Sequence, residues 1–406
     1  MPNTSYDVLA LRDHFPSLAS GIAHFDGPGG TQTPREVAEA IAATLTGPLS
    51  NRGTVGFSER RADAAVAAFR SAYADLLGVP PSGIVYGRSA TALTYDMSRA
   101  IAKTWTAGDE VVVSRLDHDG NVRPWVQAAE AAGATVRWLD IDPHSGELDL
   151  ATIGTAITPA TRLVAITAAS NLLGTMPPVR TVADAAHAVG ALVYVDAVHF
   201  AAHELVEPDA LGSDFVACSP YKFLGPHCGV LAADPELLAR FWPDKLLPST
   251  NDVPERYELG TLPYETLAGA TAAVDFLAAV DPGEAPTRRD QLRRAFAAID
   301  VHERSLRERL ESGLEALPGV VVHSRAARRT PTLLVSLPGR RCRDAYEFLA
   351  SRDVLAPAGQ FYAYEPYRRL GIDDDAGLRL GLAPYSTADE VDRALAALGE
   401  LLTGQD

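Results

Sequence analysis

Residues 191–199 (A-L-V-Y-V-D-A-V-H) and 214–231 (D-F-V-A-C-S-P-Y-K-F-L-G-P-H-C-G-V-L) decide the fold class of this chain. Each stretch contains a short apolar run without alternating polar positions, Leu192–Val195 and Phe215–Cys218. Runs of this kind are typical of strands that are buried on both faces of a parallel sheet. In both stretches a charged residue follows the run, near the point where the strand is expected to end.

The chain around these stretches continues the pattern. From Pro80 to about Asp234, short β-branched runs alternate with alanine-rich segments of helical length. The alternation predicts an α/β fold with βαβ crossovers, a mainly parallel sheet and helices on both faces. In such sheets, ligands bind beyond the carboxyl ends of the strands. The further strands are expected at Ile84–Tyr86, Glu110–Ser114, Thr135–Leu139 and Leu163–Thr167, and the helices at Thr91–Lys103, Asn121–Ala132, Leu150–Ile157 and Thr181–Val189.

The C-terminal part has a different pattern, which predicts a smaller α+β domain. Residues 288–317 form a long amphipathic helical pattern, and Thr387 with Glu390 has the spacing of a capping box. We therefore expect three parts: an N-terminal segment at 1–24, a large domain at 25–284 and a small domain at 285–406. Within the small domain, strands are expected at Thr332–Leu337 and Leu378–Ala383, and helices at Asp344–Arg352 and Thr387–Leu402.

Composition excludes several classes of protein. The 406 residues carry 36 Lys and Arg against 52 Asp and Glu, and a net charge of −16 disfavours nucleic acid as a partner. No apolar run approaches the ~20 residues that cross a bilayer, and the N-terminus lacks the pattern of a signal peptide. Three cysteines without CxxC spacing favour the cytoplasm. The acidic turn Asp373–Asp375 is interpreted as a solvated loop rather than a metal site.

Asp196 and Lys222 follow the two apolar runs and are the first candidates for chemistry. A carboxylate after five apolar residues is costly to bury without a cationic partner, although a strand cap or a metal ligand is an alternative reading. Lysine occurs only at positions 103, 222 and 245. An ammonium group that is desolvated among apolar residues loses its proton easily, which suits a Schiff-base nucleophile. A structural salt bridge is the alternative for Lys222.

Three more strand ends carry polar groups to the same edge of the sheet. An amide follows one strand at Asn171, and a flat imidazole that could stack on a planar cofactor follows another at His118. Residues 84–91 are expected to form a strand, a turn with a glycine and the start of a helix. The free N–H groups and the dipole at such a helix start can bind a phosphate, and this segment is called the phosphate seat. Lysine, carboxylate, amide, imidazole and phosphate seat are together what pyridoxal phosphate requires.

With these residues the sequence resembles the class V aminotransferase family of fold-type I pyridoxal-phosphate enzymes, in its cysteine desulfurase-like branch. The likeness extends from His24 to the C-terminal helix and is strongest in the two stretches quoted first. It implies three catalytic residues. Lys222 would form the Schiff base, Asp196 would meet the pyridine nitrogen, and His118 would stack over the ring.

The resemblance also implies further cofactor contacts and a homodimer. These contacts would be His199 near the cofactor, Asn171 near the ring oxygen, Ala90 and Thr91 at the phosphate with Ser219 assisting, and Gly260 and Thr261 reaching the phosphate of the neighbouring subunit.

For the substrate, the resemblance points to Arg379 as the residue that grips an amino-acid carboxylate. An arginine among apolar strand residues also favours a bidentate anion by itself, with an inter-strand ion pair as the alternative. The family's desulfurases use a mobile cysteine shortly before this strand. Here residues 356–369 contain no cysteine but several aromatic residues, among them Tyr362, which could position or protonate a leaving group.

The leading hypothesis is therefore a lyase that acts on cysteine or an S-substituted cysteine by β-elimination. An aminotransferase on an amino acid or amino sugar, a cysteine desulfurase and an epimerase are the alternatives within the family. A non-catalytic or sulfur-carrier-binding member is a further alternative, which the intact Lys222–Asp196 pair disfavours.

Overall fold

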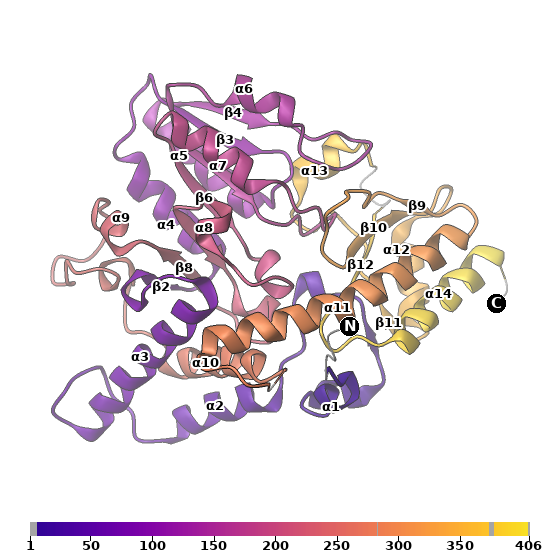
Figure 1. Cartoon of the computed structure of the whole chain (residues 1–406), viewed down its shortest axis with the longest axis horizontal. Helices are drawn as coiled ribbons and strands as arrows, with labels where there is room; N and C mark the ends of the chain where they lie inside the picture. Colours follow the sequence, from indigo (N-terminus) through magenta and orange to yellow (C-terminus); the bar gives the residue numbers. More distant parts are fainter. Residues whose placement is uncertain (1–5, 282, 373–376, 405–406) are drawn as a thin grey trace.

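The computed structural model describes residues 6–281, 283–372 and 377–404. A seven-stranded sheet forms the centre of the larger part (Figure 1). Its strands, in spatial order, are β2 (Ile84–Gly87), β8 (Gly229–Ala233), β7 (Phe215–Cys218), β6 (Leu192–Asp196), β5 (Thr161–Thr167), β3 (Glu110–Ser114) and β4 (Thr135–Leu139).

The sheet is mainly parallel, which confirms the expected fold class. Strands β7, β6, β5, β3 and β4 run parallel to one another, whereas β8 is antiparallel to both of its neighbours, β7 and β2. Strand β8 was not predicted from the sequence. Its residues are all buried and apolar, and such a run has no periodicity that separates a strand from a buried helical turn.

Helices cover both faces of the sheet, because neighbouring residues of each strand point to opposite sides. On one side, Val112 belongs to a core with α3 (Phe57–Leu77), α7 (Val179–Ala188) and α10 (Tyr264–Ala278). On the other side, Val111 and Val113 belong to a core with α4 (Ala90–Ala102) and α5 (Arg123–Ala132). The remaining helices of this part include α2 (Arg35–Thr46), α6 (Ile153–Ala156), α8 (Pro208–Leu211) and α9 (Pro235–Ala239).

The C-terminal part has its own sheet and its own core. The strands β12 (Leu378–Gly381), β10 (Thr332–Ser336) and β9 (Val321–Val322) are antiparallel and pack with α11 (Arg288–Ala316), α12 (Cys342–Ala350) and α14 (Ala388–Thr403). Helix α14 starts with the expected capping box of Thr387 and Glu390. The short helix α13 (Tyr364–Arg369) lies apart from these elements, beside the large sheet (Figure 1).

The N-terminal residues are joined to the C-terminal part. Strand β1 (Ala23–His24) pairs in parallel with β11 (Val354–Leu355). After α1 (Val8–Arg12), the guanidinium of Arg12 lies 3.0 Å from the Glu390 carboxylate. The division at residues 24 and 284 stays a prediction, and the acidic turn Asp373–Asp375 lies outside the described residues.

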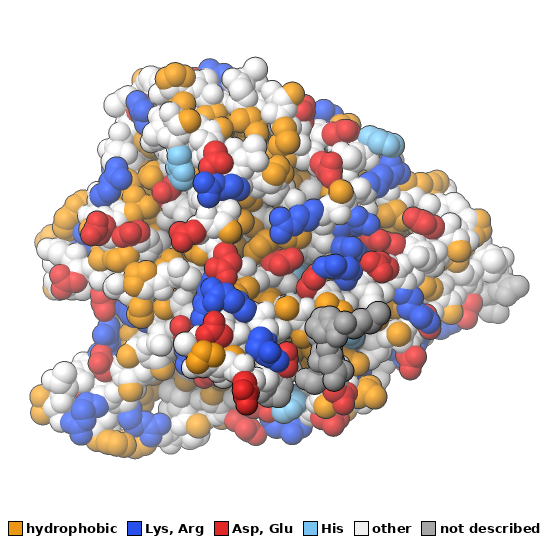
Figure 2. Space-filling view, viewed as in Figure 1, with side chains coloured by type: hydrophobic (Ala, Val, Ile, Leu, Met, Phe, Trp, Pro, Cys, Tyr) orange, Lys and Arg blue, Asp and Glu red, His pale blue; other side chains and the backbone are white. Residues whose placement is uncertain are grey.

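Acidic and basic side chains are interspersed on the face shown in Figure 2. Along α11 they form ion pairs, for example Arg304 with Asp300 and Arg309 with Asp392. Across the ranges that the structure describes, no helix combines the length and the apolar character needed to span a membrane.

Candidate active site

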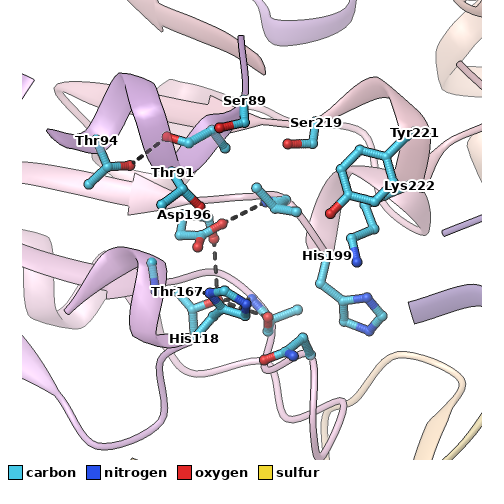
Figure 3. Close-up of a pocket in the computed structure, with 15 residues that line it drawn as sticks. Ser89, Thr91, Thr94, His118, Thr167, Asp196, His199, Ser219, Tyr221 and Lys222 are labelled. Carbon is cyan, nitrogen blue, oxygen red and sulfur yellow. Dashed lines mark hydrogen bonds between the residues drawn. The ribbon is translucent and has the colours of Figure 1, made fainter. Parts of the chain in front are cut away.

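A cavity lies at the carboxyl ends of the parallel strands, where ligands bind in sheets of this kind. It brings together eight of the residues that the sequence analysis selected. Figure 3 shows Thr91 and Asp196 close together on one side of this cavity and Lys222 on the opposite side. The eight residues are Ala90, Thr91, His118, Asn171, Asp196, His199, Ser219 and Lys222.

Lys222 lies at the end of a short 3₁₀ turn after β7 and is only 9% exposed. Its Nζ donates a hydrogen bond to the carbonyl oxygen of Pro28 and lies 4.8 Å from the centroid of the Tyr221 ring. Burial, and to a smaller extent the nearby charge of Arg379, lower the pKa of Lys222 to about 7, whereas the charge of Asp196 opposes the shift. A substantial fraction of the amine is therefore uncharged near neutral pH, as a nucleophile requires.

Asp196 ends β6, and its Oδ1 accepts a hydrogen bond of 2.8 Å from the backbone N–H of Val198. The carboxylate thus makes the local cap that was one alternative reading, and it also faces the cavity. Burial raises its pKa to about 6, against the Val198 hydrogen bond and the charge of Lys222. A buried carboxyl with this pKa can share a proton with a ring nitrogen.

Asp117 is a second buried carboxyl beside the cavity, and the sequence analysis missed it. It is 0% exposed and accepts hydrogen bonds from Ser114 Oγ (2.5 Å) and Asn121 Nδ2 (2.7 Å). Burial, and to a smaller extent the charge of Asp196, raise the pKa of Asp117 to about 7. An aspartate next to a selected histidine has no local pattern that distinguishes it from an ordinary loop residue.

His118 immediately follows Asp117 and presents a neutral ring. Its Nδ1 accepts a hydrogen bond of 2.9 Å from the backbone N–H of Gly120, which fixes the ring. Burial, and then the charges of Lys222 and Arg379, lower the pKa of His118 to about 4. A flat, uncharged imidazole at the cavity wall suits stacking on an aromatic cofactor.

His199 is buried between the large sheet and strand β10. Its Nε2 lies 3.0 Å from the hydroxyl oxygens of both Thr330 and Thr332, whereas its Nδ1 has no partner in the described chain. Burial holds the pKa of His199 well below its usual value. Behind it, the His203 ring lies 4.9 Å away and is bound to the buried Glu303 carboxylate at 2.8 Å.

In Asn171, too, one polar atom of the side chain has a hydrogen-bond partner and the other has none among the described residues. Its Nδ2 donates to the carbonyl oxygen of Phe361 at 2.9 Å, while its buried Oδ1 has no partner among the described residues. A buried amide oxygen without a partner is unfavourable unless a ligand supplies a donor. Asn171 and His199 each therefore carry a free polar atom at the same cavity.

The expected phosphate seat is the start of α4. Ser89 caps this helix through its Oγ, which accepts from the Ala92 N–H at 3.1 Å, and Ala90 and Thr91 line the cavity. The first N–H groups of a helix have no partner within the helix and attract anions. Strand β8 packs directly against this turn at Gly229, where an added Cβ would lie 2.3 Å from the Ser89 carbonyl carbon.

Four selected residues do not line the cavity. Gly260 and Thr261 are exposed on the surface, and Gly260 has a φ of +84°. Tyr362 is 78% exposed beyond the cavity wall, and its carbonyl oxygen accepts from the Asp119 N–H at 2.7 Å. Arg379 lies behind Asn171, to whose carbonyl oxygen its Nη1 donates at 3.0 Å. Their roles stay predictions.

Arg379 is nevertheless an unusual arginine. It is 3% exposed, its guanidinium carbon lies 3.8 Å from the centroid of the Phe361 ring, and its Nε has no partner. Burial lowers its pKa to about 9, while Asp26 and Tyr221 oppose this shift. Within the described ranges no carboxylate lies at ion-pair distance from it, so an inter-strand ion pair does not account for its charge.

The three cysteines lie away from the reacting groups. Cys218, Cys228 and Cys342 are free and buried, and none lines the cavity. Burial raises the pKa of Cys228 to about 12 and that of Cys342 to about 11, and holds that of Cys218 well above its usual value. Such thiols are poor nucleophiles, because the thiolate is the reactive form.

The cavity fits pyridoxal phosphate on the structure's own features. A helix N-terminus would hold the phosphate, and an uncharged amine would bind the aldehyde carbon. A buried carboxyl would face the ring nitrogen, and two unpartnered polar atoms, Asn171 Oδ1 and His199 Nδ1, await ligand groups. The fold and the cavity together define a pyridoxal-phosphate enzyme of fold type I.

Comparison with known proteins identifies the family. The family model for class-V aminotransferases matches residues 23–394. The chain therefore belongs to the class V aminotransferase family of pyridoxal-phosphate enzymes, and it is cysteine desulfurase-like.

Relatives of similar length support this assignment. An uncharacterized protein of Mycobacterium tuberculosis is 33% identical over 402 residues, covering 97% of this chain and 100% of the relative. The aminotransferase-like protein FGM3 of Gibberella zeae is 30% identical, with coverage of 99% and 100%. A cysteine desulfurase of Dickeya dadantii is 29% identical, with coverage of 98% and 97%. The solved cysteine desulfurase CsdA of Escherichia coli has a TM-score of 0.86 at 27% identity, with coverage of 98% and 99%.

Proposed function

We propose that this protein is a pyridoxal-phosphate-dependent lyase that cleaves the C–S bond of cysteine or an S-substituted cysteine by β-elimination. One observation carries the proposal. The cavity combines a lysine of lowered pKa with a buried carboxyl, while all three thiols are buried elsewhere. The names of several relatives support cysteine as the parent substrate, and the absence of a cavity thiol disfavours persulfide chemistry.

In this proposal the residues have separate tasks. Lys222 Nζ binds the cofactor and then accepts the Cα proton, for which its pKa of about 7 is suited. Asp196 holds the proton of the ring nitrogen, and Arg379 binds the substrate carboxylate. When bound, pyridoxal phosphate supplies an electron sink for the negative charge that develops at Cα.

The proposed reaction balances without an oxidant or reductant. An S-substituted cysteine and one water molecule give pyruvate, ammonia and the thiol. The Cα–H, Cβ–S and Cα–N bonds break. The leaving sulfur and Cβ each take up a proton, which gives the thiol and the methyl group of pyruvate, and water supplies the keto oxygen of pyruvate as ammonia leaves. For a leaving thiolate the proton donor proposed here is the hydroxyl group of Tyr362.

Product analysis tests this function. The holoenzyme is incubated with L-cysteine and with S-methyl-L-cysteine, and sulfide or thiol, pyruvate, alanine and ammonia are quantified together. Equal amounts of pyruvate and sulfide or thiol are expected. Alanine with a protein-bound persulfide would instead establish desulfuration, and a keto acid that retains sulfur and forms only with an added amino acceptor would establish transamination. Transamination is the function that the name of the Gibberella relative favours.

A variant without cysteines sharpens the test. Replacing Cys218, Cys228 and Cys342 together by Ala is expected to leave turnover within about threefold of wild type once folding is verified by circular dichroism, because none of them lines the cavity. Loss of turnover in the folded variant would contradict elimination without a thiol.

The proposal includes a homodimer in the cytoplasm. Exposure of Gly260 and Thr261 supports a role outside their own subunit's cavity, at the phosphate of a partner. Three free cysteines support a reducing compartment.

A further inference from the structure

A hollow lies beside the active-site cavity, and of its lining residues the lyase chemistry above uses only Tyr362. Its lining residues, here called the aromatic hollow, are Asp119, Arg123, Gln360, Phe361, Tyr362 and Tyr364. We propose that the aromatic hollow holds the sulfur substituent of the substrate, and that this substituent is an uncharged planar ring. The inference rests on the proposed function and narrows its substrate class to S-aryl or S-arylmethyl cysteines.

The position of the aromatic hollow relative to the site is the first argument. The Phe361 ring packs against the guanidinium of Arg379, the proposed carboxylate anchor, at 3.8 Å. The ring of Tyr362 lies 5.7 Å from that of His118, which lines the active-site cavity. A substrate held by its carboxylate at Arg379 therefore has the aromatic hollow as the adjoining space for its side chain.

The loop that forms the aromatic hollow is held in place, which is the second argument. Asn171 Nδ2 and the Asp119 N–H donate to the carbonyl oxygens of Phe361 and Tyr362, at 2.9 and 2.7 Å. Both aromatic residues have a φ of +56°, a left-handed conformation that costs large side chains on the order of 1 kcal/mol or more each. Consecutive residues keep such a conformation only where surrounding contacts enforce it, so the wall is preformed rather than a swinging arm.

Charge is the third argument. The Arg123 guanidinium is the cation of the aromatic hollow, and it is paired with Asp119 and with Glu365, both at 2.7 Å. An anionic substituent would have to compete with two carboxylates, and a cationic one would meet a paired arginine. The three rings of Phe361, Tyr362 and Tyr364 instead offer aromatic contact, which favours an uncharged planar group.

Substrate preference tests the inference in the full-length holoenzyme. The kcat/KM of S-benzyl-L-cysteine is compared with that of S-methyl-L-cysteine by thiol release. We expect the ratio to exceed about ten in wild type and to fall at least tenfold in Tyr362→Ala and in Tyr364→Ala, because each removes one aromatic wall. Tyr364→Phe, which keeps the ring, should retain the preference, and Tyr346→Ala on α12 is the remote control with unchanged ratio.

The outcomes separate this inference from the proposed function. Turnover of both compounds with a ratio near one, or a ratio unaffected by the two alanine variants, would overturn the inference and leave the lyase function standing. If neither compound is turned over, the lyase function fails and calorimetric binding of the same two compounds decides the subsite. At least tenfold tighter binding of S-benzyl-L-cysteine supports it, and equal binding overturns it.

Discussion

At the residue scale, Lys222 titrates near neutral pH because burial removes water from its ammonium group. With a pKa of about 7, the uncharged fraction rises from about one tenth at pH 6 to about nine tenths at pH 8. The rate at which apoprotein captures pyridoxal phosphate should therefore rise about tenfold over this interval, measured by the visible absorbance of the Schiff base.

Two controls accompany this measurement. Lys222→Ala should show no such absorbance while its circular dichroism remains that of a folded protein. A capture rate that begins to rise only above pH 9 would mean that the ammonium is solvated and that the lysine is not prepared for attack.

Asp117 should make stability depend on pH. Its native pKa of about 7 lies above the unfolded value of roughly 4, so the native state binds the proton more tightly between these limits. By linkage, the contribution of this group to stability decreases as pH rises from about 4 to about 7. The asparagine of Asp117→Asn cannot titrate. The melting temperature of this variant minus that of wild type should therefore increase by about 2 °C or more from pH 5 to pH 8.

Differential scanning calorimetry at the two pH values measures this change. A difference between variant and wild type that is the same at pH 5 and pH 8 would show that Asp117 stays ionised in the folded chain. Asp392→Asn, at an exposed ion pair, is the control and should show no such trend.

Eight of the residues selected from the sequence line one cavity. Most of them follow the carboxyl end of a strand or open the next helix, whereas His199 and Ser219 were selected on the family resemblance. The sequence alone could not identify Thr330 and Thr332, which meet His199 only through the packing of β10 against the large sheet. Phe361 was missed for a different reason. A bulky residue at φ +56° is enforced by distant contacts, and local propensity predicts the opposite.

At the scale of elements, strand prediction worked for the buried strands β3 and β7 and also for the partly exposed edge strand β4. The expected bounds of β3, β4 and β7 agree with the structure, since short β-branched apolar runs have clear ends. The segment expected as one helix at 121–132 instead begins with a 3₁₀ turn at Asp119–Asn121, and α5 starts only at Arg123. Hydrogen bonding of His118 and Asn121 within the site fixes this turn, a tertiary effect that periodicity does not report.

Helix α13 depends on one buried carboxylate for its place beside the large sheet. Glu365 accepts from Arg115 at 2.8 Å and from Arg123 at 2.7 Å, and these contacts join segments far apart in the chain. Glu365→Gln should lower the free energy of unfolding by about 1–3 kcal/mol, because Arg115 and Arg123 lose their buried counter-charge and keep only Asp140 and Asp119, respectively.

Urea unfolding measures this effect, and limited proteolysis reports where it acts. Cleavage of the segment 356–370 should become faster in Glu365→Gln than in wild type. An unchanged unfolding free energy together with unchanged cleavage would show that other contacts hold α13.

At the scale of the whole molecule, the proposed dimer predicts that subunits complement each other. Thr261→Ala homodimers should bind pyridoxal phosphate about tenfold more weakly, the usual effect of losing a hydrogen bond to a charged group. A hybrid dimer of one Thr261→Ala subunit and one Lys222→Ala subunit contains one site with an intact lysine and an intact partner loop. That single site should bind with wild-type affinity.

Differently tagged subunits allow the hybrid to be purified, and absorbance titration gives its affinity. A hybrid that binds pyridoxal phosphate as weakly as the Thr261→Ala homodimer would place Thr261 in its own subunit's site. Sedimentation of the protein as a monomer would contradict the proposed dimer.

The parallel pairing of β1 with β11 has a consequence for biosynthesis. Ala23 is synthesised early, but its strand partner Val354 is synthesised only when most of the chain has been translated. At the usual rate of translation the delay is on the order of tens of seconds. During this time the loop containing Pro28, which contacts Lys222, has no C-terminal strand to hold it. The nascent chain is therefore expected to bind pyridoxal phosphate after release from the ribosome rather than during synthesis. Cells with little pyridoxal phosphate should accumulate full-length protein without the cofactor.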